Sequence, residues 1–154
     1  MNSFKIIPFD ESHVNAVIEY EKELRRQEPD TYFWKPDEEY KNGLVASFSD
    51  DRFKNAVSYI AVRGEAVIGR LDAMVMASRN DPACCSAYLD WICVLKSERH
   101  NKVAQALLEA LRKDLKARNV SLLIALMAQN EEAQHFYKSV EGASIHDEGI
   151  WIDI

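Results

Sequence analysis

The chain has little cysteine, and its few thiols are not arranged for a shared structural role. Cys84 and Cys85 are adjacent, Cys93 follows them, and none has C-x-x-C spacing or a neighbouring histidine. An odd number of cysteines without such spacing argues against a disulfide framework and against a cysteine-based zinc site. We therefore expect reduced thiols whose main role is packing.

Basic residues are also fewer than acidic ones, 19 against 25. The 154 residues carry a formal net charge of −6, and the pI is near 5.2. Such a chain lacks the positive field that grips a phosphate backbone, so we expect no nucleic-acid partner. A cationic partner suits this charge better.

Long apolar runs are missing as well. No stretch approaches the roughly 18 uninterrupted apolar residues of a membrane helix. Residues 1–13, MNSFKIIPFDESH, contain neither the apolar segment nor the small-residue cleavage site of a secretory signal. We expect no membrane partner and a cytoplasmic location.

Two catalytic classes lack their motifs. His13, His100, His135 and His146 fall on different predicted elements without partners at metal-ligand spacing, so we expect no metal site. The G-x-S-x-G elbow that presents the serine of many hydrolases is also absent. Neither metal-assisted chemistry nor serine hydrolysis is indicated.

Apolar periodicity predicts one domain over residues 1–154, in which strands and helices alternate. Strands are expected at 3–9, 56–62, 66–77, 86–95, 120–128 and 149–154, with a tight turn at Gly64 between the second and third. Helices are expected after Asp10 or Ser12, from Pro36 and Asp37 onward, at 101–119 and at 131–140. The second half is thus an α/β layer design, in which ligands gather where strand ends meet helix N-termini.

At one such junction, basic residues stand directly before the predicted helix. Residues 97–111, SERHNKVAQALLEAL, place Arg99, His100, Asn101 and Lys102 directly before an amphipathic helix, soon after a strand that ends at Val94. A strand end that feeds a helix through a short polar connection can present several backbone N–H groups to one phosphate. Simple solvation of the basic residues is the alternative from this stretch alone.

Two blocks around one strand together resemble the GNAT superfamily of N-acetyltransferases, and the order of elements agrees along the whole chain. The first block, YLDWICVLKSERHNKVAQALLEAL, is similar to the family's strand ending in Val and its R/Q-x-x-G-x-G/A loop for the pyrophosphate of acetyl-CoA. It matches at Val94, Arg99 and Ala104, whereas Lys102 stands where the first glycine is usual. The second block, N-x-x-A-x-x-F-Y, is complete as Asn130, Ala133, Phe136 and Tyr137.

The resemblance implies a mixed α/β fold. Its central sheet would be mixed but mostly antiparallel, with about six or seven strands flanked by about four helices. Acetyl-CoA would be the acetyl donor, with its pyrophosphate on 99–104 and its pantetheine along the strand edge at 92–94. The residues expected to bind it are Ile92, Cys93, Val94, Arg99, His100, Asn101, Lys102, Val103, Ala104, Asn130 and Tyr137.

Lys102 leaves two interpretations open. Glycine allows close approach of backbone to phosphate, whereas lysine carries a Cβ and a long stem. With helical φ its N–H would stay usable, and the ammonium would add a charge-assisted contact to phosphate. Otherwise the side chain blocks the pocket and the cofactor is lost.

Two residues are candidates for proton transfer. Acyl transfer from a thioester to an amine needs a base for the amine and an acid for the departing thiolate. Tyr137 suits the acid because a phenol has a pKa near 10, although a core tyrosine is the alternative. Asp90 interrupts an apolar strand, and strict alternation puts it on the face of Tyr88, Ile92 and Val94. It is the candidate base or, alternatively, an anchor for the ammonium of the acceptor.

The acceptor is expected near residues 25–39, RRQEPDTYFWKPDEE, which the resemblance implies would line the acceptor side. Tyr32, Phe33 and Trp34 lie there among carboxylates, a combination suited to a cationic amine, although ordinary anchoring aromatics would look the same. We expect transfer to a primary amine of a polyamine, an aminoglycoside-like molecule or an amino-acid derivative. A catalytically silent CoA sensor or an interaction module on the same fold is the alternative.

The final run, GIWIDI, is expected to be an apolar strand whose edge must be covered. A homodimer would cover it, as would a partner strand in the same chain.

Overall fold

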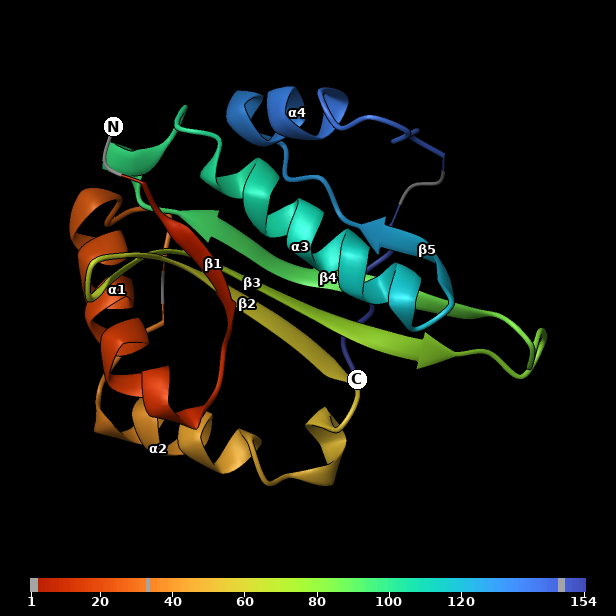
Figure 1. The fold of residues 1–154 in the computed structure, drawn as a ribbon, viewed down its shortest axis with the longest axis horizontal. Helices are drawn as coiled ribbons and strands as arrows, with labels where there is room; N and C mark the ends of the chain where they lie inside the picture. The colour runs from red at the N-terminus through yellow and green to blue at the C-terminus, as the bar shows by residue number, and fades with distance from the viewer. Residues whose placement is uncertain (1–2, 33, 147–148) are drawn as a thin grey trace.

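A five-stranded sheet runs through the middle of the computed structural model, which describes residues 3–32, 34–146 and 149–154 (Figure 1). Its strands lie in chain order: β1 (Lys5–Pro8), β2 (Ala56–Arg63), β3 (Ala66–Ala77), β4 (Cys85–Val94) and β5 (Val120–Ala125). The first four pair antiparallel, and β5 pairs parallel to β4. The predicted mixed, mostly antiparallel sheet is confirmed, with fewer strands than the predicted six or seven.

Four α-helices accompany the sheet: α1 (Val14–Gln27), α2 (Glu38–Ser47), α3 (Val103–Ala117) and α4 (Glu131–Lys138). Single 3-10 turns occupy Glu11–His13, Asp51–Phe53 and Lys96–Glu98. Side-chain oxygens of Asp10, Asp37 and Asn130 accept bonds from backbone N–H groups at the starts of the 3-10 turn before α1, of α2 and of α4. Such caps satisfy N–H groups that have no partner within the helix. In the described part of the chain, no helix is both long enough and apolar enough to cross a membrane.

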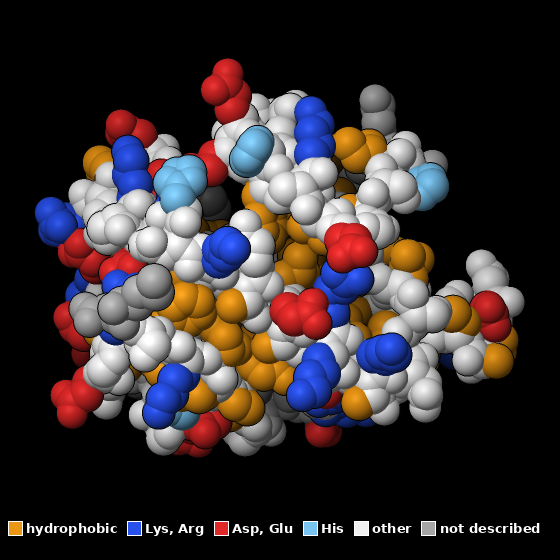
Figure 2. Space-filling model, turned by 45° about the horizontal axis from the view of Figure 1, so that its top comes forward, with side chains coloured by type: hydrophobic (Ala, Val, Ile, Leu, Met, Phe, Trp, Pro, Cys, Tyr) orange, Lys and Arg blue, Asp and Glu red, His pale blue; other side chains and the backbone are white. Residues whose placement is uncertain are grey.

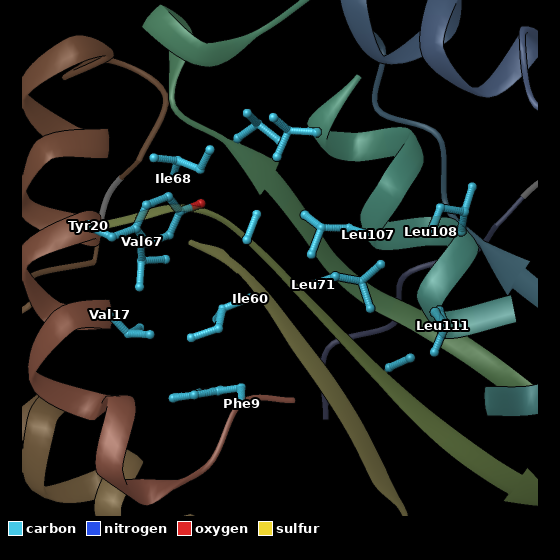
Figure 3. Packing of buried hydrophobic residues seen from close by; sticks show 14 of the residues in the cluster. Phe9, Val17, Tyr20, Ile60, Val67, Ile68, Leu71, Leu107, Leu108 and Leu111 are labelled. Atoms are coloured by element: carbon cyan, nitrogen blue, oxygen red, sulfur yellow. The ribbon is translucent and has the colours of Figure 1, made fainter. Parts of the chain in front are cut away.

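The helices cover both faces of the sheet. Leu107 and Leu111 of α3 are fully buried in the same hydrophobic cluster as Leu71 of β3. Val17 of α1 and Ile60 of β2 belong to this cluster as well, and Figure 3 shows them on the side of the sheet away from α3. Helices therefore cover both faces of the sheet, and β1 and β5 are its edge strands among the described residues.

The C-terminal segment does not form the predicted strand. Residues 149–154 are described but belong to no strand, and Trp151, Ile152 and Ile154 are exposed. A strand needs a neighbour for its backbone groups, and within the described residues β5 pairs on one side only, with β4. Three adjacent apolar residues, Ile150 to Ile152, also lack the alternation that would bury one face of an added strand. Leu122 and Ile124 of β5 are exposed.

Candidate active site

The pairing of strands β4 and β5 ends halfway along β4. Their pairing ends at Leu89 and Ala125, whereas β4 continues to Val94, so residues 90–94 run on without β5 beside them (Figure 1). This stretch contains the predicted pantetheine edge. Two of its carbonyls already accept bonds, Cys93 from the Tyr20 hydroxyl (2.9 Å) and Val94 from Arg99 Nε (3.3 Å).

A β-bulge lies where the pairing of β4 with β5 ends. Asp72 of β3 is opposite Trp91, and the next residue, Ala73, is opposite Leu89, so Asp90 has no partner residue in β3. A bulge of this kind inserts one residue into a strand and re-aims the side chains beside it. The side chain of Asp90 is exposed and, among the described residues, has neither a hydrogen-bond nor an ion-pair partner.

The bulge corrects the predicted face of Asp90. Tyr88 and Asp90 line a common cleft on the face covered by α2, as alternation predicted. Beyond the bulge the pleat is shifted: Ile92 lies opposite Leu71 and Val94 opposite Gly69, on the face that packs against α3. The prediction that Asp90 shares its face with Ile92 and Val94 was therefore wrong, because alternation assumes an unbroken pleat.

The cleft beside Asp90 has a volume of about 700 Å³. Its walls come from α2 and the turn after it on one side and from the faces of β2, β3 and β4 on the other. The lining residues include Phe9, Tyr40, Leu44, Phe48, Phe53, Ser58, Arg70, Asp72, Met74, Tyr88 and Asp90. The volume and the mostly apolar lining with a few polar groups are typical of a small-molecule site.

Buried charges form the floor of this cleft. Arg70 Nη1 donates to Glu21 Oε1 (2.6 Å), and Arg70 Nε is in ion-pair contact with Asp72 Oδ2 (2.6 Å), although its N–H is not aligned for a hydrogen bond. The hydroxyls of Tyr40 and Ser58 donate to Glu21 and Asp72 respectively. Burial is the main reason that the pKa of Tyr40 is raised to about 12.

Sequence reasoning missed this network. A signal was present, since Glu21 interrupts the apolar face of α1 between Val17 and Leu24, and Arg70 interrupts the apolar run of β3. A buried charge needs a partner, so two such interruptions on neighbouring elements favour an ion pair.

The loop before α3 has the backbone conformation that a glycine-rich loop would have. His100 and Lys102 both have left-handed φ, at 64° and 62°. Lys102 is the N-cap of α3 and makes no side-chain cap, so the first N–H groups of the helix have no such partner. Lys102 therefore does not have the helical φ that the first of the two interpretations assumed, and it takes the conformation that glycine adopts freely, at a cost of about 1–2 kcal/mol for a side-chain-bearing residue.

Arg99 is occupied by carboxylates. Its guanidinium donates to Glu28 at the end of α1 and to Glu132 of α4 (2.7 Å), and the side chain is mostly buried. Arg99 thus ties α1 and α4 to the loop before α3, and its direct contact with a phosphate is not favoured by this arrangement. His100 and Asn101 are exposed, whereas Val103 is buried and Ala104 partly so.

The two predicted residues of the second block have different surroundings. Asn130 caps α4, its Oδ1 accepting from the N–H of Ala133 (2.8 Å). Tyr137 is partly buried beside Phe136, with ring centroids 5.1 Å apart. Burial, with a smaller contribution from nearby Tyr88, raises the pKa of the Tyr137 phenol. Tyr88 lines the cleft, whereas Tyr137 does not.

The aromatic loop between α1 and α2 packs inward. Tyr32 is buried, with its hydroxyl 2.8 Å from Cys93 Sγ, and Trp34 Nε1 donates to Glu21 (2.9 Å). Both rings stack edge-on against Trp91. Neither residue lines the cleft, and Phe33 lies outside the described residues. The alternative reading of Tyr32 and Trp34, as anchors of a helix connection, fits this arrangement.

The side of the molecule that carries α4 and the start of α3 is hollowed (Figure 2). Hydrophobic side chains line the middle of this hollow, and basic, acidic and histidine side chains surround it. In the part of the chain that the structure describes, no three His, Cys, Asp or Glu side chains gather as a metal site. Because its middle is apolar and its surroundings are polar, the hollow suits a ligand with polar and apolar parts.

Comparison with known proteins agrees with this arrangement. The sequence model of the acetyltransferase (GNAT) family matches residues 14–142. No curated protein matches the sequence as a relative.

Solved structures share the fold at low sequence identity. An aminoglycoside acetyltransferase, meta-AAC0020, from an uncultured soil metagenomic sample in complex with sisomicin has a TM-score of 0.80 and 14% identity over 98% of this chain and 96% of that one. A predicted acetyltransferase with acetyl-CoA from Clostridium acetobutylicum has a TM-score of 0.72 and 15% identity, with coverage of 98% and 96%. A ribosomal-protein-alanine N-acetyltransferase from Brucella melitensis has a TM-score of 0.73 and 14% identity, with coverage of 98% and 99%. Because the family match spans most of the chain and the fold agrees, the chain belongs to the GNAT family of acetyltransferases.

Proposed function

We propose that the chain transfers the acetyl group of acetyl-CoA directly to a primary amine of a small cationic acceptor. One observation carries the proposal: the bulge at Asp90 lies where the opening between β4 and β5 meets a cleft large enough for a small molecule. A donor along the opening and an acceptor in the cleft would meet there. A polyamine, an aminoglycoside-like molecule and an amino-acid derivative are the acceptors considered, and the neighbour solved with sisomicin supports this range.

Backbone groups before and in the first turn of α3 suit the diphosphate of acetyl-CoA. Lys102 is left-handed and Val103 begins the helix, an alternation that turns successive N–H groups toward one side. The exposed Lys102 ammonium would add a charge-assisted contact. Residues 92–94 would offer backbone groups to the pantetheine arm, and Asn130 and Arg99 would act by holding α4 and the loop in place.

The reaction needs one proton transfer from the acceptor amine in the cleft and one to the sulfur of the donor. The acceptor amine loses a proton to Asp90, directly or through water, and its nitrogen then attacks the thioester carbonyl. A C–N bond forms and the C–S bond breaks. Tyr137 gives its phenolic proton to the departing thiolate. The second proton that the nitrogen loses as the amide forms returns to the Tyr137 phenolate through solvent, and Asp90 releases its proton to solvent. The raised pKa of Tyr137 keeps this phenol protonated throughout the neutral range.

We further propose that residues 1–154 act as one domain in the cytoplasm, and as a homodimer. The side chains of Trp151, Ile152 and Ile154, and those of Leu122 and Ile124 of the edge strand, are exposed apolar groups that a second copy would cover.

Lys102 variants test the cofactor site. Lys102→Gly and Lys102→Met both remove the ammonium, and only the first also removes the Cβ. We expect each to weaken acetyl-CoA binding by about 1 kcal/mol, because both lose one charge-assisted contact while the loop conformation is kept. Calorimetric titration with acetyl-CoA measures this. Tighter binding by Lys102→Gly would instead mean that the lysine obstructs the pocket.

Tyr137→Phe tests the acid. The ring and its packing are kept while the proton donor is lost, so we expect turnover to fall by about 10² to 10⁴ with an almost unchanged acetyl-CoA dissociation constant. Because burial raises the pKa of Tyr137, the fall in activity at high pH should begin above about pH 10 in the parent and be absent in the variant. Turnover at the parental rate would make Tyr137 a packing residue only.

Asp90→Asn tests the base. The variant keeps the size of the side chain and loses the proton acceptor, so we expect the low-pH limb of the kcat profile to disappear and kcat to fall by roughly 10² or more. Initial rates of thiol release across pH measure both. A higher KM with the limb retained would contradict the base role and leave Asp90 as an anchor for charge.

Sedimentation velocity tests the dimer. At micromolar concentration the parent should sediment as a dimer, and Trp151→Glu combined with Ile152→Glu should give monomer, because two charges cannot be buried in an apolar contact without partners. A parent that is only monomeric at that concentration would remove the dimer proposal.

A further inference from the structure

Large apolar side chains form much of the wall of the acceptor cleft, above its polar floor. Phe48 and Phe53, from α2 and the turn after it, are 39% and 43% exposed, although both are large aromatic residues. Leu44 and Met74 continue the same lining. Such exposure at the wall of a cleft leaves apolar surface that an apolar ligand can cover.

Of the described carboxylates that line the cleft, Asp72 and Asp90, only one is free to meet a cation. Asp72 is in contact with Arg70 and accepts from the Ser58 hydroxyl (2.6 Å). Glu21, behind the floor, is 2% exposed and accepts from Arg70, Tyr40 and Trp34. Asp90 is exposed and has no partner in the ranges that the structure describes.

The free carboxylate and the aromatic wall lie on opposite sides of the cleft. Asp90 belongs to β4, whereas Phe53 precedes Ala56 at the start of β2, with β3 between the two strands. Neighbouring strands are about 4.8 Å apart, so β2 and β4 are separated by about 10 Å. A molecule that reaches from Asp90 to Phe53 therefore has its charge at one end and its apolar body across the floor.

From this arrangement we infer that the acceptor is a primary monoamine with an apolar or aromatic body, its ammonium at Asp90 and its body between Phe53, Phe48 and Met74. The inference rests on the proposed acetyl transfer and narrows it. A polyamine or an aminoglycoside would bring further cations against aromatic and aliphatic walls and toward Arg70, where they would lose water without gaining a carboxylate.

A matched pair of amines isolates the second charge. Hexylamine and 1,6-diaminohexane have the same chain and differ by one amine, and the diamine has the statistical advantage of two reactive ends. With acetyl-CoA saturating, we expect kcat/KM for hexylamine to exceed that for the diamine by at least tenfold, measured by release of free thiol. 2-Phenylethylamine should react comparably to hexylamine, and spermidine and kanamycin should be poorer than both.

A designed carboxylate tests the placement. Phe53→Glu puts a charge at the apolar end of the cleft, so it should lower kcat/KM for hexylamine and raise it for 1,6-diaminohexane, reducing or reversing the preference of the parent. Ile145→Glu, an equally drastic change at a 69% exposed position that does not line the cleft, should leave the preference as it is.

The outcomes separate this inference from the proposed function. A diamine, spermidine or kanamycin that reacts as well as hexylamine overturns the monoamine assignment and leaves acetyl transfer standing. An unchanged preference in Phe53→Glu overturns the placement of the body. If no amine releases thiol although acetyl-CoA binds in calorimetry, the proposed transfer itself fails.

Discussion

The site depends on one irregularity, the extra residue that β4 carries at Asp90. A regular antiparallel strand would keep its pleat, and each side chain would stay on the face that its position dictates. The bulge lets Tyr88 and Asp90 line the cleft under α2 while Ile92 and Val94, further along, pack under α3. Because β5 also stops pairing at this point, the strand is open on its other side where the bulge re-aims it.

Electrostatics in the core keep the cleft in shape around this strand. Arg70 of β3 joins Glu21 of α1 and Asp72 beside it, and Tyr40 links α2 to the same carboxylate as Arg70. A buried charge that loses its partner costs several kcal/mol, so α1, α2 and the sheet are held in one relative arrangement. Arg99 plays a similar part near the start of α3, where it joins α1 and α4 to the loop before that helix.

The sequence was sufficient for the elements and for the family, because these depend on local periodicity and on spacing along the chain. The span of β3, the existence of a helix shortly after Pro36 and the strand-to-helix junction before Val103 agree with the structure. What could not be predicted depends on contacts across the sheet. A bulge is invisible to an alternation rule, and a contact between Glu21 and Arg70 requires the tertiary fold.

Two other differences have similar causes. The left-handed φ of Lys102 opposes the preference of the residue type, so residue type gave no indication of it. Tyr32 looked like a binding residue because aromatic rings among carboxylates suit both a ligand and a core, and its hydroxyl lies instead beside the Cys93 thiol.

The most direct measurement of the central claim is the product balance of one reaction. Purified protein would be incubated with acetyl-CoA and hexylamine, and free CoA and N-acetylhexylamine would be quantified together by mass spectrometry. We predict that the two products form in equal amounts and only when protein, donor and amine are all present. Release of CoA without acetylated amine, or no product of either kind, would contradict direct acetyl transfer at the junction of β4 and the cleft.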